Sequence, residues 1–202
     1  MKNIVLYCLF LSLFAPNTGA AEKFLFLGDS LTEGYQLSKE SSYPSLIEKM
    51  LQKNHSKDIK VLNGGVSGST TASGMSRLRW FMKAKPTVLV LALGGNDGLR
   101  GFSLKDSYSN LEKIISYALE NKLKVLLCGM KMPPNYGAKY QKGFEENFTK
   151  LAKKFKIPFY PFLLVGVGGN PKLNLADGIH PNEEGYKIIA ANLYKKIKKE
   201  FL

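Results

Sequence analysis

The chain has 202 residues, of which 45% are hydrophobic, and this is about the length of one domain with one substantial core. Its formal net charge is +13, a field that favours anionic surfaces or substrates. The sequence carries no zinc-finger, RNA-recognition or helix-turn-helix signature, so we expect no nucleic-acid partner despite this charge.

Residues 1–21 have the pattern of a secretory signal peptide. Lys2 is the only charged residue before position 22, and the apolar run Ile4–Ala15 is too short to span a bilayer as a helix. Small residues follow, so we expect cleavage near Ala20 or Ala21. A retained membrane anchor is the alternative, which the short run disfavours. Cleavage would release residues 22–202 as one periplasmic or secreted domain.

Short apolar runs alternate with longer segments of helical periodicity in the rest of the chain. Several runs are apolar at successive positions, which is typical of parallel strands buried on both faces. The expected strands are Phe24–Leu27, Ile59–Leu62, Val88–Leu93, Lys124–Leu127 and Pro158–Phe162. The expected helices are Tyr43–Asn54, Gly74–Lys83, Leu104–Asn121, Lys139–Phe155 and Asn182–Leu202. This alternation predicts an open α/β fold of three layers around a five-stranded parallel sheet.

Ser30 is the first residue with the chemistry of a nucleophile. It follows an expected strand, a glycine and Asp29, so its hydroxyl can be exposed at a sharp turn beyond the carboxyl end of the sheet, where such folds form their sites. A serine hydroxyl is a poor nucleophile unless a base takes its proton. Alone, this tripeptide is more typical of a turn or a helix cap.

Asp177 and His180 supply what Ser30 lacks. The chain has two histidines, and only His180, unlike His55, has a carboxylate three residues away in a turn bounded by glycine and proline. The imidazole can accept the Ser30 proton while Asp177 orients it and stabilises its charged form. The plainer alternative is a helix-capping aspartate and a surface histidine.

Acyl transfer also needs donors fixed where negative charge develops on the acyl oxygen. The loop Gly94–Asp97 follows the most hydrophobic expected strand, and the Asn96 amide is a natural donor. The loop Gly64–Gly68 can direct the Gly68 N–H, and the Ser30 N–H would be a third donor. A phosphate cradle is the alternative for the second loop, but no lysine follows in P-loop spacing.

Together these segments resemble the four blocks of the SGNH (GDSL) hydrolases. The blocks are Gly28-Asp29-Ser30-Leu31, Gly68, Gly94-x-Asn96-Asp97 and Asp177-x-x-His180, in order and correctly spaced from about residue 23 onward. Residues 94–101 and 134–137 are similar to the multifunctional periplasmic thioesterase/lysophospholipase/arylesterase branch. Ser69 departs from that branch, which often has an acidic residue there; the catalytic roles are untouched, but the contacts of this loop are in question.

The resemblance implies a fold and a set of roles. The fold would be a flavodoxin-like three-layer α/β/α sandwich. Ser30 would be the nucleophile, His180 the general base and then acid, and Asp177 its orienting partner. The Ser30 N–H, the Gly68 N–H and the Asn96 amide would form the oxyanion hole. No metal or cofactor is implied.

The acyl pocket is expected between the loop Asp97–Phe102 and the segment Met132–Tyr140. Its candidate lining residues are Tyr35, Leu99, Phe102, Tyr136 and Leu175. For each of them, a place in the core is the plainer alternative.

These observations predict a serine carboxylic-ester hydrolase that forms an acyl-enzyme. Its expected substrates are acyl esters, aryl esters, acyl thioesters or lysophospholipids, and we expect a monomer. A carbohydrate O-acetylesterase would share the triad but have a short, polar pocket. A non-catalytic flavodoxin-like module would bind a flavin or nucleotide phosphate at the same loops, but catalytic-type residues in the right order disfavour it. The C-terminal lysines favour weak association with anionic membrane surfaces; they are Lys195, Lys196, Lys198 and Lys199.

Overall fold

The computed structural model describes residues 22–202, which form a five-stranded parallel sheet in the order β2-β1-β3-β4-β5. The strands are β1 (Lys23–Gly28), β2 (Lys60–Gly65), β3 (Val88–Ala92), β4 (Lys124–Cys128) and β5 (Phe159–Tyr160). This order is that of flavodoxin-like doubly wound sheets. The predicted signal peptide, residues 1–21, lies outside the described residues.

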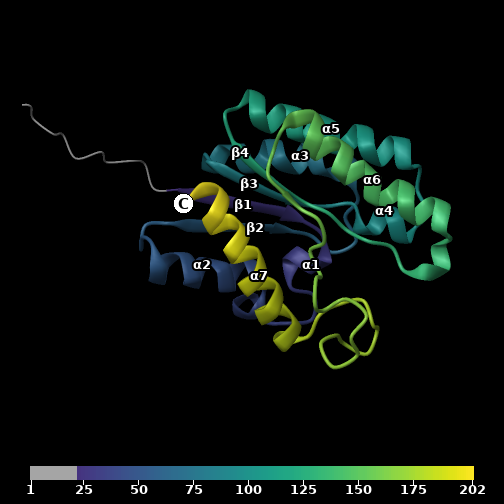
Figure 1. The fold of residues 1–202 in the computed structure, drawn as a ribbon. Helices are drawn as coiled ribbons and strands as arrows, with labels where there is room; N and C mark the ends of the chain where they lie inside the picture. Colours follow the sequence, from purple (N-terminus) through teal and green to yellow (C-terminus); the bar gives the residue numbers. More distant parts are fainter. Residues whose placement is uncertain (1–21) are drawn as a thin grey trace, which may run out of the picture.

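Helices cover both faces of the sheet, which gives the predicted three layers (Figure 1). One face carries α2 (Tyr43–Asn54) and α7 (Glu183–Phe201), and the other carries α3 (Thr71–Phe81), α5 (Leu104–Glu120) and α6 (Ala138–Phe155). Short helices α1 (Ser30–Glu33) and α4 (Gly95–Leu99) follow β1 and β3 directly. Within residues 22–202, none of the helices has both the length and the apolar character that a membrane crossing requires.

The core lies around the two central strands, β1 and β3. Every side chain of Phe24–Leu27 and Val88–Leu91 has no exposed surface, because helices pack on both faces of these strands. The carboxyl ends of β1 and β3 are adjacent, with Gly28 opposite Ala92. The segments that follow these two strands therefore begin side by side, and this places Ser30 next to α4.

Several element boundaries differ from the prediction for identifiable reasons. Strand β5 has two residues because prolines on both sides, Pro158 and Pro161, cannot donate to a sheet. Helix α3 begins at Thr71 and not at Gly74, because the Asp97 carboxylate accepts the Thr71 N–H at 2.9 Å. The segment after β3, expected as a loop, contains α4.

Two glycines allow α1 to lie directly against the carboxyl end of the sheet. A Cβ atom on Gly65, at the end of β2, would lie 2.1 Å from the backbone nitrogen of Glu33 and 2.6 Å from its Cα. A Cβ atom on Gly28 would lie 1.9 Å from Thr32 Oγ1. Such distances are far below van der Waals contact, so the position of α1 depends on the missing side chains.

Gly65→Ala should therefore lower the free energy of unfolding by about 1–3 kcal/mol, because backbone atoms of α1 must move to admit the methyl group. Urea denaturation would measure the change. Gly143→Ala in α6 is the matched control, since its only contact within 4 Å would be the flexible end of Leu104. Alanine also favours a helix, so the control should be neutral or stabilising. Equal stability of the Gly65 and Gly143 variants would contradict the tight packing of α1.

Candidate active site

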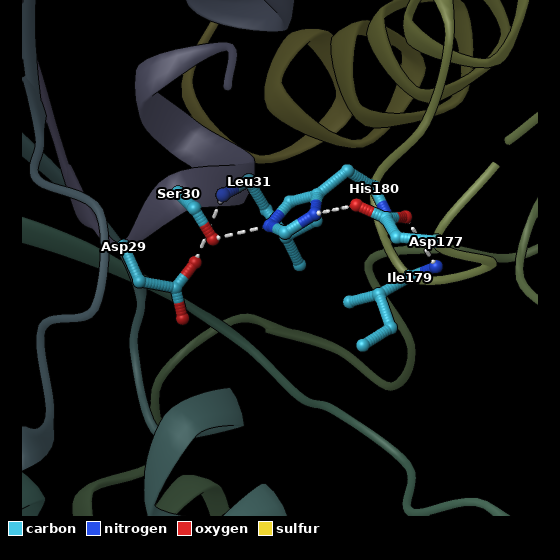
Figure 2. A network of polar contacts seen from close by, with 6 residues as sticks. All are labelled: Asp29, Ser30, Leu31, Asp177, Ile179 and His180. Atoms are coloured by element: carbon cyan, nitrogen blue, oxygen red, sulfur yellow. Dashed lines mark hydrogen bonds and ion pairs between the residues drawn. The ribbon is translucent and has the colours of Figure 1, made fainter. Parts of the chain in front are cut away.

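Ser30, His180 and Asp177 form one hydrogen-bonded chain (Figure 2). Ser30 is the first residue of α1, and the other two lie in the loop before α7. His180 Nε2 is 2.9 Å from Ser30 Oγ, and His180 Nδ1 is 2.7 Å from Asp177 Oδ2. The fold thus brings together three side chains that were predicted as a set although up to 150 positions separate them in sequence.

The Asp177 carboxylate binds both the backbone of its own turn and the ring of His180. Asp177 Oδ1 accepts the backbone N–H groups of Ile179 and His180, each at 2.9 Å, and Oδ2 faces the imidazole. Burial opposes ionisation, but these hydrogen bonds outweigh it and lower the pKa of Asp177 to about 2. An ionised carboxylate can only accept, so Nδ1 carries the imidazole proton and Nε2 is left to accept from the Ser30 hydroxyl.

The loop around His180 is fixed on both sides. The Leu175 N–H donates to the His180 carbonyl at 2.7 Å, and Asn174 forms an isolated bridge with Pro181. The ring of Tyr35 lies over the imidazole, with a centroid separation of 4.3 Å. The His180 side chain is 16% exposed, and these contacts define the orientation of its ring.

Helix α1 is tied to the two helices that cover its face of the sheet. Tyr186 of α7 donates to the Leu31 carbonyl at 2.9 Å, and Thr32 Oγ1 is 2.7 Å from the hydroxyl of Tyr43 in α2. Both tyrosine side chains are fully buried. Because α7 also begins two residues after Pro181, the same helix fixes the position of Ser30 and the end of the loop that contains His180.

Asp29 caps α1 with a buried carboxyl group. Its Oδ1 accepts the Leu31 N–H at 3.1 Å, and its side chain is 3% exposed. Burial raises the pKa of Asp29 to about 6, although the Leu31 hydrogen bond and the nearby His180 and Arg77 act in the opposite direction. Asp29, next to Ser30, therefore carries a destabilised charge at neutral pH.

Two of the predicted oxyanion donors, Gly68 and Asn96, lie on segments that contact each other. Gly68 has a φ of +74°, and the Ser69 N–H donates to the Val66 carbonyl at 3.1 Å, which closes a turn around Gly68. Asn96, in the first turn of α4, donates one amide hydrogen to the Ser69 carbonyl at 3.0 Å. A side-chain amide has two hydrogens, so the second remains for a ligand.

Asp97 anchors α4 in this position. Its buried carboxylate accepts from the Thr71 N–H at 2.9 Å, from the Thr71 hydroxyl at 2.6 Å and from the Ser107 hydroxyl at 3.2 Å. The neighbour of Asn96 thus joins α4 to α3 and α5, which fixes the direction of the Asn96 amide.

Two residues of the site were not predicted. Arg77 donates to the Gly28 carbonyl at 2.9 Å and to the Gly64 carbonyl, so it joins the carboxyl ends of β1 and β2. Glu33 accepts the Ser67 N–H at 2.8 Å and also the Ser67 hydroxyl. Arg77 could have been found as a charged residue beside Leu78 on the inward face of α3; nothing in the sequence marks Glu33.

The predicted acyl-pocket residues fall into two groups. Tyr35 and Leu175 contact His180, whereas Tyr136 donates to the Leu99 carbonyl at 2.8 Å and Phe102 is 46% exposed. A cavity of about 810 Å³ includes Tyr136 but none of the predicted catalytic or oxyanion residues; it is also lined by Leu104, Gly137, Ala138, Lys139, Tyr140, Lys142, Gly143 and Glu146. The structure thus places this cavity beside the α6 amino terminus and not at Ser30.

The raised pKa of Asp29 predicts a pH-dependent gain of stability in Asp29→Asn. Because the folded pKa of about 6 lies above the usual aspartate pKa of 3.8, ionisation destabilises the folded state as pH rises from about 4 to 6. Asparagine can accept the Leu31 N–H without that charge. The variant should exceed the parent by on the order of 1–3 kcal/mol in unfolding free energy at pH 7.5, and much less at pH 4. Denaturant unfolding at pH 7.5 and at pH 4 measures this difference. Asp58→Asn, at an exposed position, is the control. Equal stability of Asp29→Asn and the parent at pH 7.5 would contradict the effect of burial on the Asp29 charge.

Comparison with known proteins agrees with this geometry. Residues 26–188 match the model of the GDSL-like lipase/acylhydrolase family. An arylesterase of Vibrio mimicus is 38% identical over 98% of this chain and 99% of its own length. The thioesterase 1/protease 1/lysophospholipase L1 of Escherichia coli K12 is 36% identical over 94% of this chain and 90% of its own.

Solved structures of related enzymes are similar to this chain as well. The crystal structure of TesA has a TM-score of 0.85 and 34% identity, covering 89% of this chain and all of that one. The psychrotrophic esterase EstA from Pseudoalteromonas sp., inhibited by monoethylphosphonate, has a TM-score of 0.83 and 31% identity, covering 88% of this chain and 97% of that one. The chain therefore belongs to the GDSL-like lipase/acylhydrolase family and is an ester-bond hydrolase.

Proposed function

We propose that the protein hydrolyses acyl esters, aryl esters, acyl thioesters and lysophospholipids through an acyl-enzyme on Ser30. The observation that carries this proposal is the hydrogen-bonded chain from Ser30 Oγ through His180 to Asp177, at 2.9 Å and 2.7 Å. The names of the relatives, an arylesterase and a thioesterase/lysophospholipase, support this range of substrates.

In the first half of the reaction, His180 Nε2 takes the Ser30 proton as Oγ attacks the acyl carbon. The carbonyl π electrons move to oxygen and form a tetrahedral oxyanion. His180 then gives its proton to the leaving oxygen or sulfur, the bond to that atom breaks, and the acyl group stays on Ser30. Water repeats the sequence in the second half, which releases the carboxylic acid and restores the serine.

Asp177 stabilises the imidazolium that exists between these two proton transfers. With its pKa lowered to about 2, it stays ionised throughout the neutral and mildly acidic range. It therefore orients the ring and balances its charge without accepting the proton itself.

The oxyanion would be bound by the Ser30 N–H, the Gly68 N–H and the second hydrogen of the Asn96 amide. These donors lie beyond β1, β2 and β3 and are held before substrate arrives, so little reorganisation is needed. Each is expected to contribute about 3–4 kcal/mol to transition-state stabilisation. The monoethylphosphonate bound to EstA is a tetrahedral phosphorus group, which resembles such an intermediate in shape and charge.

The acyl group would leave this hole between Tyr35 and Leu175 on the histidine side and the segment Leu99–Phe102 on the other. Tyr136 would support that segment through its hydrogen bond to the Leu99 carbonyl. These five side chains are apolar or amphipathic, as an acyl chain requires.

Ser30→Ala should lower kcat for a p-nitrophenyl ester by on the order of 10⁴-fold or more, because no other group can form the acyl-enzyme. His180→Gln should have an effect of similar size. His55→Gln is the matched control, since His55 contacts Tyr194 at the far end of α2 and should leave kcat unchanged. Steady-state kinetics on folded variants would measure both, and full activity of Ser30→Ala would end the proposal.

We further propose that the mature chain is a periplasmic or secreted monomer that associates weakly with anionic membrane surfaces. The lysines Lys195, Lys198 and Lys199 are exposed on α7, whereas Lys196 pairs with Glu200 at 2.8 Å. Phe201 packs on Phe24 at the start of β1, with ring centroids 6.5 Å apart. These lysines therefore lie at the end of the sheet opposite Ser30.

Replacing Lys195, Lys198 and Lys199 together with glutamine should weaken binding to anionic phospholipid vesicles, by up to about 1 kcal/mol for each lysine. The value of kcat/KM for a soluble ester should not change, because the lysines are remote from the site. Cosedimentation with vesicles at low and high salt measures the effect. Binding that salt does not weaken would show that the association is not electrostatic.

A further inference from the structure

The Gly68 N–H belongs to the central peptide of a β-turn. The turn runs from Val66 to Ser69, is closed by the Ser69 N–H to Val66 carbonyl bond of 3.1 Å, and has a negative φ at Ser67 and a φ of +74° at Gly68. This is the pattern of a type II turn. Types I and II differ in the direction of the peptide between their two central residues. Rotation of the Ser67–Gly68 peptide would therefore turn the Gly68 N–H away from the oxyanion.

Three side chains hold this turn from outside. Asn96 binds the Ser69 carbonyl at 3.0 Å, Arg100 binds the Gly68 carbonyl at 3.1 Å, and Glu33 binds both the N–H, at 2.8 Å, and the hydroxyl of Ser67. Of the three, only Glu33 contacts Ser67. The carbonyl of Ser67 belongs to the peptide whose rotation would turn the Gly68 N–H away. Its carboxylate makes two charge-assisted hydrogen bonds, which are stronger than neutral ones.

Glu33 also links this turn to the nucleophile. It is the last residue of α1, three positions after Ser30, and its backbone touches Gly65 at the end of β2. The Ser30 N–H and the Gly68 N–H thus belong to two segments joined by one side chain. Both N–H groups would bind the same oxygen atom, so the distance between them must be fixed. A side chain that links the two segments helps to fix this distance.

We propose that Glu33 is a positioning residue of the oxyanion hole, which holds the Ser67–Gly68 peptide with the Gly68 N–H toward the acyl oxygen. The inference rests on the proposed function, because it assumes that Gly68 binds the oxyanion. Glu33 itself touches neither substrate nor reacting atoms; it acts through Ser67.

The first test separates transition-state binding from substrate binding. Glu33→Ala should lower kcat for a p-nitrophenyl ester by on the order of 10- to 100-fold, less than complete loss of one donor, and change KM by no more than about twofold. A boronic acid that adds to Ser30 Oγ forms a tetrahedral anion with an oxygen in the hole. Its Ki should rise by the same factor as kcat falls. Glu33→Gln, which still accepts the Ser67 N–H, should restore most of the activity.

The second test uses the turn itself. Proline is favoured at the second position of a type II turn and has no N–H, so Ser67→Pro would preset the turn and remove the partner of Glu33. Ser67→Pro alone should stay within about threefold of the parent. The double variant Glu33→Ala/Ser67→Pro should match Ser67→Pro, so that the loss seen in Glu33→Ala disappears. Glu184→Ala, an exposed carboxylate paired with Lys187, is the matched control and should not change kcat or Ki.

An unchanged kcat and Ki in Glu33→Ala, or an equal loss in the parent and the Ser67→Pro background, would overturn the inference. Circular dichroism and thermal unfolding of each variant would identify a general folding defect, which proline would not repair. Ser30→Ala distinguishes a failure of the proposed function from a failure of the proposed role of Glu33. If Ser30→Ala is active, the proposed function fails; if it is inactive while Glu33→Ala is normal, only the role of Glu33 fails.

Discussion

The contact of 2.9 Å between Ser30 Oγ and His180 Nε2 is the constraint on which the rest of the structure depends. It joins a residue near the start of the described chain to one near its end, and proton transfer tolerates little change in its length. The buried tyrosines Tyr43 and Tyr186 connect α1 to α2 and α7, and α7 starts directly after the histidine loop. Helix α7 thus helps to fix the positions of Ser30 and His180 relative to each other.

The same region carries a stability cost that is consistent with a functional site. Asp29 is buried beside Ser30 with its pKa raised to about 6, so the folded protein holds an unfavourable charge at neutral pH. Two strand-end glycines, Gly28 and Gly65, allow backbone contacts that side chains would prevent. The buried charge lowers stability, whereas the two glycines allow the close packing that fixes α1 in place. Functional sites often show this compromise.

Much of the fold and the main residues of the site could be predicted from sequence because the physical signals are local. The continuous apolar runs around Phe24–Leu27 and Val88–Leu93 require burial on both faces, and this alone indicates a covered parallel sheet. Polar residues directly after such strands must then gather at one edge, which brings Ser30 and Asn96 close together. The pair Asp177 and His180 was identifiable because three residues and a turn are enough to make the two side chains meet.

The remaining features depend on contacts between distant segments. The start of α3 at Thr71 depends on Asp97, and the short β5 on two prolines acting at a sheet edge. The bond from Glu33 to Ser67 joins positions 34 residues apart with no pattern to mark either. The acyl pocket was the least predictable part, because Tyr35 lies against His180 and Tyr136 supports a neighbouring loop. Apolar character alone does not distinguish a residue that contacts His180 from one that supports a neighbouring loop.

The distribution of charge further limits what can select the substrate. Helix α7 begins at Glu183, beside His180, so at 1.5 Å per residue Lys195 and Lys199 lie about 18 and 24 Å from its start. The Debye length at physiological ionic strength is about 8 Å, so the terminal lysines are screened from the site. These α7 lysines can therefore favour binding to an anionic surface without attracting a substrate into the site. Selection between neutral esters and anionic lipids therefore depends on charges closer to the site, such as Arg100, which is exposed and donates to the Gly68 carbonyl at 3.1 Å.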